Sequence, residues 1–139
     1  LAGPLADLRI TFGRLYAEKD LAIEIDVTDG LAVACDAQDV DEMLGNLIDN
    51  ACQWSRGRVR VTAAATEAGI AVTVADDGPG LDTEAAARAV RPGGRLDESV
   101  PGHGFGLSIT RELAELSGGG LRLGRSDLGG LSARLLLPA

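Results

Sequence analysis

Three short stretches of this 139-residue chain carry the side chains that could do chemistry. In "GNLIDNACQW" (45–54), Asn46 and Asn50 lie four residues apart, and Gln53 and Trp54 follow within a turn of Asn50. At about 100° per residue, this spacing places both amides on one edge of a helix, beside its apolar stripe. Two interpretations stay open: the amides are solvated or act as caps, or an amide oxygen binds a hard cation such as Mg²⁺.

The second stretch is "IAVTVADDGPG" (70–80), an alternating strand that ends in acidic residues and glycines. The alternation places Asp76 on the apolar face of the strand, aimed at the core. A buried carboxylate costs several kcal/mol unless a donor pairs with it. That donor is either a backbone N–H or a ligand with an exocyclic amine, and Gly78 and Gly80 would let a flat ligand approach the backbone.

The third stretch, "PGHGFGL" (101–107), places Gly102, Gly104 and Gly106 directly before a helix. Glycines there expose successive N–H groups at a helix N-terminus, which can cradle a phosphate. The same pattern also occurs in plain linkers, so alone it is weak evidence. The only histidine of the chain, His103, lies between these glycines.

The elements that must position these residues follow from periodicity. Together they predict one α/β domain over 1–139, a two-layer sandwich. We expect a mixed, mostly antiparallel sheet of about five strands, with about three helices on one face. A turn at Asp29-Gly30 also predicts a hairpin to the apolar run 31–35. The predicted helices are 4–19, 38–55, 105–117 and a short one at 82–89 in a long loop (78–104), and the predicted strands are 21–27, 58–65, 70–77, 121–125 and 131–137.

Composition excludes several classes of protein. The net charge is −8, from 21 acidic and 13 basic residues, which argues against nucleic acid as a partner. No apolar run approaches the ~20 residues that a membrane span needs, so this chain does not itself cross a membrane. Cys35 and Cys52 have no metal-like spacing, and we expect them to be reduced core residues.

Taken in order, these motifs resemble the ATP-binding catalytic domain of sensor histidine kinases (HATPase_c), in the GHKL superfamily, with the PhoQ-like branch most similar. The resemblance covers essentially the whole chain and implies the Bergerat fold. It implies binding of Mg²⁺·ATP and transfer of the γ-phosphoryl group to a histidine on a separate dimerisation domain, N-terminal to this one and absent here. A response regulator would be the further partner.

The resemblance also assigns roles to the asparagine helix and the aspartate. Asn50 would be the Mg²⁺ ligand, and Asn46 would lie nearby on the phosphate side; both are the predicted catalytic residues. Asp76 would accept a hydrogen bond from the adenine amino group. Trp54 takes the place of a nucleotide-packing tyrosine, although a core role is the alternative. Gln53 stands where these kinases commonly have Lys or Arg, a departure that removes a phosphate contact.

The glycine stretches match two further nucleotide-binding motifs of the family. Gly78 and Gly80 belong to the first, directly after Asp76. The second would form the hinge of a lid, with its backbone facing the phosphates. Within it, His103 occupies the variable slot and is expected to be a passenger or a weak phosphate contact. The residues of this second motif are Gly102, His103, Gly104, Phe105, Gly106 and Leu107.

The lid matches the family least well, because Val90 stands where a phenylalanine is frequent. Arg91 and Arg95 are local cations in an acidic chain, and they either meet the triphosphate or remain solvated. Ser132 lies where a threonine is frequent in a third, looser glycine motif.

Family members that hydrolyse ATP carry a glutamate at the place of Asn46. An amide cannot take a proton from water, so the resemblance favours a kinase over an ATPase. Glu42, one turn earlier, is a conceivable substitute. Two alternatives stay open: a GHKL serine kinase of the anti-sigma-factor kind, and a non-catalytic module that responds to nucleotide. The domain itself is expected to be monomeric and cytoplasmic, as part of a membrane-anchored bacterial sensor.

Overall fold

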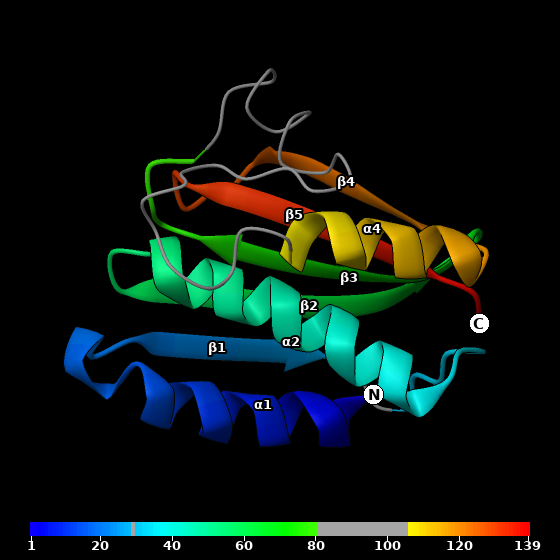
Figure 1. The fold of residues 1–139 in the computed structure, drawn as a ribbon, viewed down its shortest axis with the longest axis horizontal. Helices are drawn as coiled ribbons and strands as arrows, with labels where there is room; N and C mark the ends of the chain where they lie inside the picture. The colour runs from blue at the N-terminus through cyan, green and yellow to red at the C-terminus, as the bar shows by residue number, and fades with distance from the viewer. Residues whose placement is uncertain (29, 81–105) are drawn as a thin grey trace.

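The computed structural model describes residues 1–28, 30–80 and 106–139, and they form one sheet covered by helices (Figure 1). The predicted helix at 82–89 and most of the predicted loop 78–104 lie outside these residues. Each of the other predicted helices is present, with ends shifted by a few residues. The elements are α1 (Ala2–Leu15), the 3₁₀ helix η1 (Ala17–Lys19), β1 (Ala22–Val27), α2 (Ala37–Trp54), β2 (Arg58–Thr66), β3 (Gly69–Asp76), α4 (Gly106–Leu116), β4 (Gly120–Arg125) and β5 (Leu131–Leu137).

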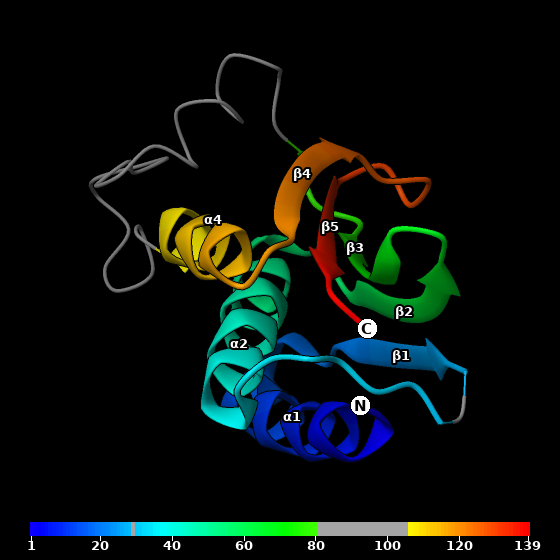
Figure 2. The same cartoon turned by 90° about the vertical axis from the view of Figure 1, so that its right-hand side faces the viewer.

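The five strands lie in the order β1-β2-β3-β5-β4. β1 runs parallel to β2, whereas the other three pairs are antiparallel. The described helices pack on one face of the sheet, with α2 between α1 and α4 (Figures 1 and 2). The predicted two-layer sandwich with a mixed, mostly antiparallel sheet is therefore confirmed.

The central helix α2 begins and ends at defined polar contacts. The Asp36 carboxylate accepts hydrogen bonds from the backbone N–H groups of Gln38 at 2.8 Å and Asp39 at 3.4 Å, as an N-cap does. At the other end, Lys19 Nζ donates to the carbonyls of Cys52 and Gln53, both at 2.8 Å. A cation there also compensates the negative end of the helix dipole.

The core lies between this helix layer and the sheet. Each fully buried aliphatic side chain contributes about 1.5–3 kcal/mol relative to exposure. No described helix is long and apolar enough to span a membrane. Cys52 is buried in this core and Cys35 is half-buried at its edge; both are free thiols. Ile23 of β1 is also buried, at 7% exposed. The largest fully buried side chains come from α1, α2, α4 and three of the strands: Leu5, Met43, Leu44, Leu47, Ile48, Val59, Val61, Val72, Val74, Thr110, Leu135 and Leu137.

The predicted hairpin between 21–27 and 31–35 is wrong. Residues 31–35 form no strand, and β1 pairs with β2, with Ala22 opposite Arg58 and Val27 opposite Ala63. The backbone N–H of Ala34 instead donates to the carbonyl of Pro138 at 2.8 Å. The run is apolar because Leu31, Val33 and Cys35 pack against the core, and not because they pair with β1.

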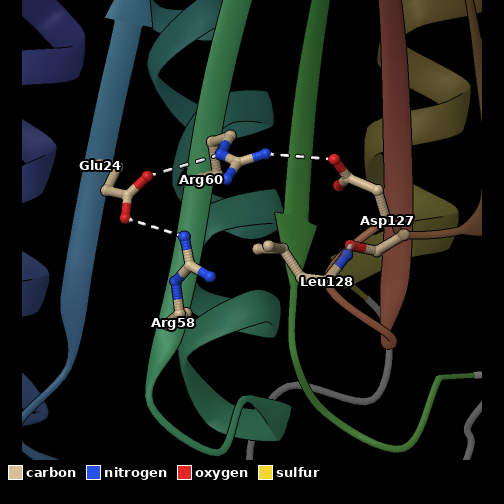
Figure 3. A network of polar contacts seen from close by, with 6 residues as sticks. Glu24, Arg58, Arg60, Asp127 and Leu128 are labelled. Atoms are coloured by element: carbon tan, nitrogen blue, oxygen red, sulfur yellow. Dashed lines mark hydrogen bonds and ion pairs between the residues drawn. The ribbon is translucent and has the colours of Figure 1, made fainter.

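The face of the sheet opposite the helices carries an ion-pair network (Figure 3). Glu24 on β1 contacts Arg58 at 3.1 Å and Arg60 at 3.5 Å, and Arg60 reaches Asp127 at 3.2 Å. Arg60 is half-buried and the other three side chains are exposed, so solvent screens these ion pairs and they contribute little to stability. The arginine partners lower the pKa of Glu24, through a hydrogen bond from Arg58 first.

Candidate functional site

One edge of α2 presents the amide side chains singled out in the sequence. Asn50 is buried, at 8% exposed, and Asn46, Gln53 and Trp54 are half-buried. Among the described residues, the buried atoms Asn46 Nδ2 and Gln53 Oε1 have no hydrogen-bond partner. Such orphaned groups are rare in folded proteins and cost free energy. A ligand with donors and acceptors along this edge would satisfy them.

The N-terminus of α4 lies directly against Asn46. A Cβ added at Gly106, the first residue of α4, would lie 3.6 Å from Asn46 Cβ and 3.8 Å from its Oδ1. Leu107 is buried at 4% exposed and anchors this turn in the core. The first N–H groups of a helix have no partner within it and attract anions. The structure thus brings the Asn46 amide close to a helix N-terminus, and these are two groups that can bind an anion.

Asp76 ends β3 with its carboxylate buried, at 1% exposed, as the alternation predicts. Its Oδ1 accepts hydrogen bonds from the backbone N–H groups of Gly78 at 2.9 Å and Leu131 at 3.2 Å. Burial raises the pKa of Asp76, although these two bonds oppose the shift. The backbone alternative is therefore confirmed, and both of these bonds end on Oδ1, one of the two carboxylate oxygens.

Glycines allow the backbone to close around this carboxylate. A Cβ at Gly78 would clash with the Trp54 carbonyl, and a Cβ at Gly130 would clash with Asp76 Oδ1. The N–H of Gly130 also donates to the Asp76 carbonyl at 3.1 Å. Gly78 thus serves a close approach between backbones, rather than leaving room for a flat ligand. The end of α2, the end of β3 and the start of β5 consequently meet at one point.

The part played by Gly130 was missed in the sequence analysis, which predicted only the strand 131–137 that begins directly after it. The signal that could have found it is its place, directly before the strand that pairs with β3. Gly80 has a left-handed φ of 71°, and its Cβ position faces the Gly130 backbone at 3.3 Å. Ser132 is half-buried and pairs with Ala75. By strand alternation it lies on the opposite face of the sheet from Asp76, so the structure does not bring these two together.

Six of the predicted site residues lie outside the described part of the chain. Their roles stay predictions from the sequence. They are Arg91, Arg95, Gly102, His103, Gly104 and Phe105.

Contacts behind the asparagine edge were also missed in the sequence. Tyr16 Oη donates to Asp49 Oδ1 at 2.6 Å, between the end of α1 and the residue next to Asn50. Burial and the Asp49 carboxylate raise the pKa of Tyr16. Burial, and then the Asp49 charge, raise the pKa of the Cys52 thiol to about 12, so it is not a reactive nucleophile. The hydrogen bond between Tyr16 and Asp49 joins residues 33 positions apart, and no local pattern predicts it.

Comparison with models of protein families shows which family this chain matches. Residues 35–139 match the model of the family described as histidine kinase-, DNA gyrase B-, and HSP90-like ATPase (HATPase_c). The chain belongs to the HATPase_c family. All of the predicted site residues lie within the matched residues, whereas α1 and β1 precede them.

Curated relatives are sensor kinases. The chain is 44% identical over 125 residues to the sensor protein kinase CarS of Pseudomonas aeruginosa, which covers 90% of this chain and 28% of CarS. It is 33% identical over 128 residues to the sensor protein PhoQ of Escherichia coli K12, covering 91% of this chain and 26% of PhoQ. The HATPase_c chain thus spans about a quarter of the length of these relatives.

Solved structures agree on the fold. The mycobacterial sensor histidine kinase MprB superposes with a TM-score of 0.84 at 25% identity, over 99% of this chain and 94% of that one. Full-length ShkA in complex with AMPPNP gives a TM-score of 0.81 at 27% identity, over 99% of this chain and 30% of that one. The catalytic domain of the histidine kinase ThkA gives a TM-score of 0.89 at 21% identity, over 99% and 91%, a likeness of fold alone.

Proposed function

We propose that this chain is the ATP-binding catalytic domain of a sensor histidine kinase. It binds Mg²⁺·ATP and transfers the γ-phosphoryl group to a histidine on a separate dimerisation domain. The observation that carries the proposal is the close approach of the N-terminus of α4 to the Asn46 side chain. It provides an anion site at one end of the polar edge of α2. The other end of this edge meets the turn that surrounds the buried Asp76.

The two ends of this edge suit the two ends of a nucleotide. Asp76 can accept a hydrogen bond from the adenine amino group at Oδ2, because its two described backbone donors are bound to Oδ1. Trp54 and Gln53 lie between, and the unpaired Gln53 Oε1 can accept from a ligand. The phosphates then lie toward Asn46 and Gly106, where N–H donors gather. The AMPPNP complex of ShkA supports a nucleotide as ligand.

Magnesium fits this donor set only together with the nucleotide. Mg²⁺ prefers oxygen ligands and retains several waters, often with phosphate oxygens as partners. The amide oxygen of Asn50 is the ligand that we assign. No group of three or more His, Cys, Asp or Glu side chains within the described residues could hold a metal by itself. When bound, the ion neutralises phosphate charge, and Mg²⁺ without nucleotide should therefore not stabilise the protein.

Phosphoryl transfer requires positioning and charge stabilisation more than covalent participation by the protein. The acceptor imidazole nitrogen attacks the γ-phosphorus, the bond to the bridging oxygen breaks, and ADP leaves with the electron pair. Asn46 and the α4 N-terminus hold the phosphates. Since the Asn46 amide cannot act as a base toward water, transfer to a nucleophilic imidazole is favoured over hydrolysis.

Partners and location belong to the proposal as well. A histidine-bearing dimerisation domain would lie in the remainder of a longer protein, because the chain spans 28% of CarS and 26% of PhoQ. The phosphoryl group would pass from there to the receiver domain of a response regulator. We place the domain on the cytoplasmic side of a membrane-anchored sensor, and we expect this domain alone to be monomeric.

The test is phosphorylation of the full-length parent protein by γ-labelled Mg²⁺·ATP. We expect an acid-labile, base-stable label, as phosphohistidine gives, that is lost in Asn50→Ala. An acid-stable label would instead support a serine kinase. Nucleotide binding without any label would support a non-catalytic, nucleotide-responsive module, an outcome that the Gln53 departure would help to explain.

A further inference from the structure

The open face of the sheet, on the side away from the helices, carries two arginines at its β4–β5 end. Arg122 and Arg134 are directly opposite each other in the antiparallel pairing of β4 with β5, and both are exposed. Leu123 and Ala133, one position along, pack on the helix side, so alternation puts both arginines on the open face. The sheet therefore separates this arginine pair from the buried Asp76 carboxylate.

The two positive charges of this pair are not compensated. Side chains directly opposite in an antiparallel pair have Cβ atoms about 4.5–5.5 Å apart, and like charges at that distance destabilise the sheet. No carboxylate in residues 1–28, 30–80 or 106–139 forms an ion pair with Arg122 or Arg134. Within the part of the chain that the structure describes, the pair is thus unfavourable, and an added anionic group would relieve the repulsion.

The other half of the same face balances its arginines with carboxylates. Glu24 pairs with Arg58 and Arg60, and Asp127, in the turn between β4 and β5, also pairs with Arg60 (Figure 3). Even the carboxylate of the β4–β5 turn thus contacts Arg60, and not the arginines of those two strands. The face consists of a balanced half over β1 and β2 and a positive half over β4 and β5.

Protection of the sheet edge accounts for only one of the two charges. β4 is an edge strand, and a charged side chain such as Arg122 on an edge strand discourages pairing with other molecules. Arg134 lies on β5, between β3 and β4, where no edge needs protection. The charge at position 134 therefore costs stability without protecting the edge, which indicates that the pair serves binding.

The geometry of the pair fits two carboxylates one helical turn apart. Side chains at i and i+4 on a helix have Cβ atoms about 5–6 Å apart, close to the spacing of the two arginines. Each guanidinium can bind a carboxylate through two parallel hydrogen bonds. The neighbours of Arg134 on this face include Thr73 and Ser132, whose short side chains leave the guanidinium accessible. An acidic helix can therefore lie across β4 and β5.

The composition of this half of the face favours a partner that binds transiently. Thr73, Ser132 and the two arginines make it polar, whereas permanent interfaces are more hydrophobic. The net charge of −8 disfavours a nucleic acid or an anionic membrane, because either would meet mostly negative surface around the pair. A separate protein that contacts only the positive half avoids this repulsion.

We propose that Arg122 and Arg134 form a docking site for an acidic helix of a separate protein, which presents two carboxylates at i and i+4. The site lies on the opposite face of the sheet from Asp76 and is independent of the proposed function. A partner can therefore bind there while the candidate nucleotide site is occupied.

The binding test uses the 139-residue chain and a fluorescein-labelled, alanine-rich helical peptide with two glutamates at i and i+4. We expect fluorescence anisotropy to show binding that weakens as the salt concentration rises. Arg134→Glu should raise the Kd for this peptide at least about tenfold, because like charges then face each other across the interface. The same peptide with glutamines in place of both glutamates should not bind.

The matched control is Arg125→Glu, which changes the net charge of the chain by the same amount. Arg125 is also an exposed arginine of β4, but it pairs with the buried Leu131, and alternation places it on the helix side of the sheet. Arg125→Glu should therefore bind the glutamate peptide with the Kd of the wild type.

Thermal unfolding tests the repulsion separately from binding. Arg134→Glu places an opposite charge beside Arg122, so it should raise the Tm by roughly 1–4 °C. Arg122→Glu should do the same, and the double variant, in which two glutamates repel each other, should return to about the wild-type Tm. A substitution that stabilises the fold and weakens binding does not act through unfolding. If neither single variant raises the Tm, the repulsion on which the proposal rests is absent.

The remaining outcomes overturn the proposal directly. It fails if the wild type does not bind the glutamate peptide, or if Arg134→Glu binds this peptide as well as the wild type does. Equal binding of the glutamine peptide also overturns it, because charge then plays no part. Binding to phosphatidylserine vesicles that is lost in Arg134→Glu, without any binding of the peptide, would assign the arginine pair to a membrane instead.

Discussion

Replacing Asp76 with Asn should separate fold stability from nucleotide binding. The Asn side chain keeps an oxygen for the N–H groups of Gly78 and Leu131, which now bind Asp76 Oδ1 at 2.9 and 3.2 Å. Its second group is an NH₂, which donates and cannot accept from the adenine amine. Losing one hydrogen bond to a charged acceptor costs about 1.5–3 kcal/mol, which raises the Kd for ATP about 10- to 150-fold.

Thermal unfolding with and without Mg²⁺·ATP measures this effect. At a concentration of about 100 times its Kd, ATP stabilises the wild type by about 2.7 kcal/mol. If Kd rises about 100-fold, the same concentration stabilises Asp76→Asn by only about 0.4 kcal/mol. In a domain of this size the rises in Tm would be roughly 10 °C and 2 °C.

Without ATP, we expect the substitution to keep or raise the thermal stability of the protein instead of lowering it. Because burial raises its pKa, the Asp76 carboxyl stabilises the fold most at low pH, and this contribution is lost as pH rises through the folded-state pKa. At pH 7.5 we therefore expect Asp76→Asn to unfold at the same or a higher Tm than wild type. The difference in Tm between Asp76→Asn and the wild type should become smaller at acidic pH. The ATP affinity of the wild type should weaken as the pH falls through this raised pKa. The ATP affinity of Asp76→Asn should not change over the same pH range.

The neighbouring Asp77 provides the control. Its Oδ1 accepts hydrogen bonds from the backbone N–H groups of Arg56 at 2.7 Å and Gly57 at 3.1 Å, away from the buried turn. Asp77→Asn should keep the full ATP-dependent rise in Tm. An equally large rise in Asp76→Asn would refute the adenine assignment and the reasoning from the buried carboxylate.

Three further substitutions test the supports of the site. Tyr16→Phe should cost about 1–2 kcal/mol at pH 8, and a double-mutant cycle with Asp49→Asn should assign most of this loss to their 2.6 Å hydrogen bond. Because the pKa of Tyr16 is raised, the loss should shrink as pH rises above about 10, the ordinary tyrosine value. Gly130→Ala should destabilise by about 2 kcal/mol or more by denaturant unfolding, whereas Gly124→Ala, with open space around its Cβ position, should not. Lys19→Met should cost about 1–2 kcal/mol by removing donors from two carbonyls at the end of α2, and retained stability would contradict that role.

The spacing of apolar residues predicted the helices and strands that depend only on their own segment of sequence. The apolar period of α2 and the alternation of β3 located both elements to within about one residue, and the alternation also predicted that Asp76 is buried. Periodicity gives burial and element type, because each follows from the geometry of a single segment.

Contacts between residues far apart in the sequence could not be predicted from local patterns. The run 31–35 is apolar and follows a turn, and nothing local distinguishes a hairpin partner of β1 from a segment packed on the core. The steric role of Gly130 depends on a strand 55 residues away, as the 3.2 Å bond from Leu131 to Asp76 shows. The hydrogen bond between Tyr16 and Asp49 spans 33 residues. Such contacts follow from the assembled fold rather than from a motif.

The parallel pairing of β1 with β2 determines how far this domain can be shortened. The family match begins at residue 35, yet β1 supplies six residue pairs to the sheet and α1 supplies Leu5 to the core. Trimming the protein to the matched residues would leave the backbone N–H and C=O groups of β2 open along one side. An open strand edge recruits strands from other molecules, so the shortened protein should aggregate where the longer one remains in solution.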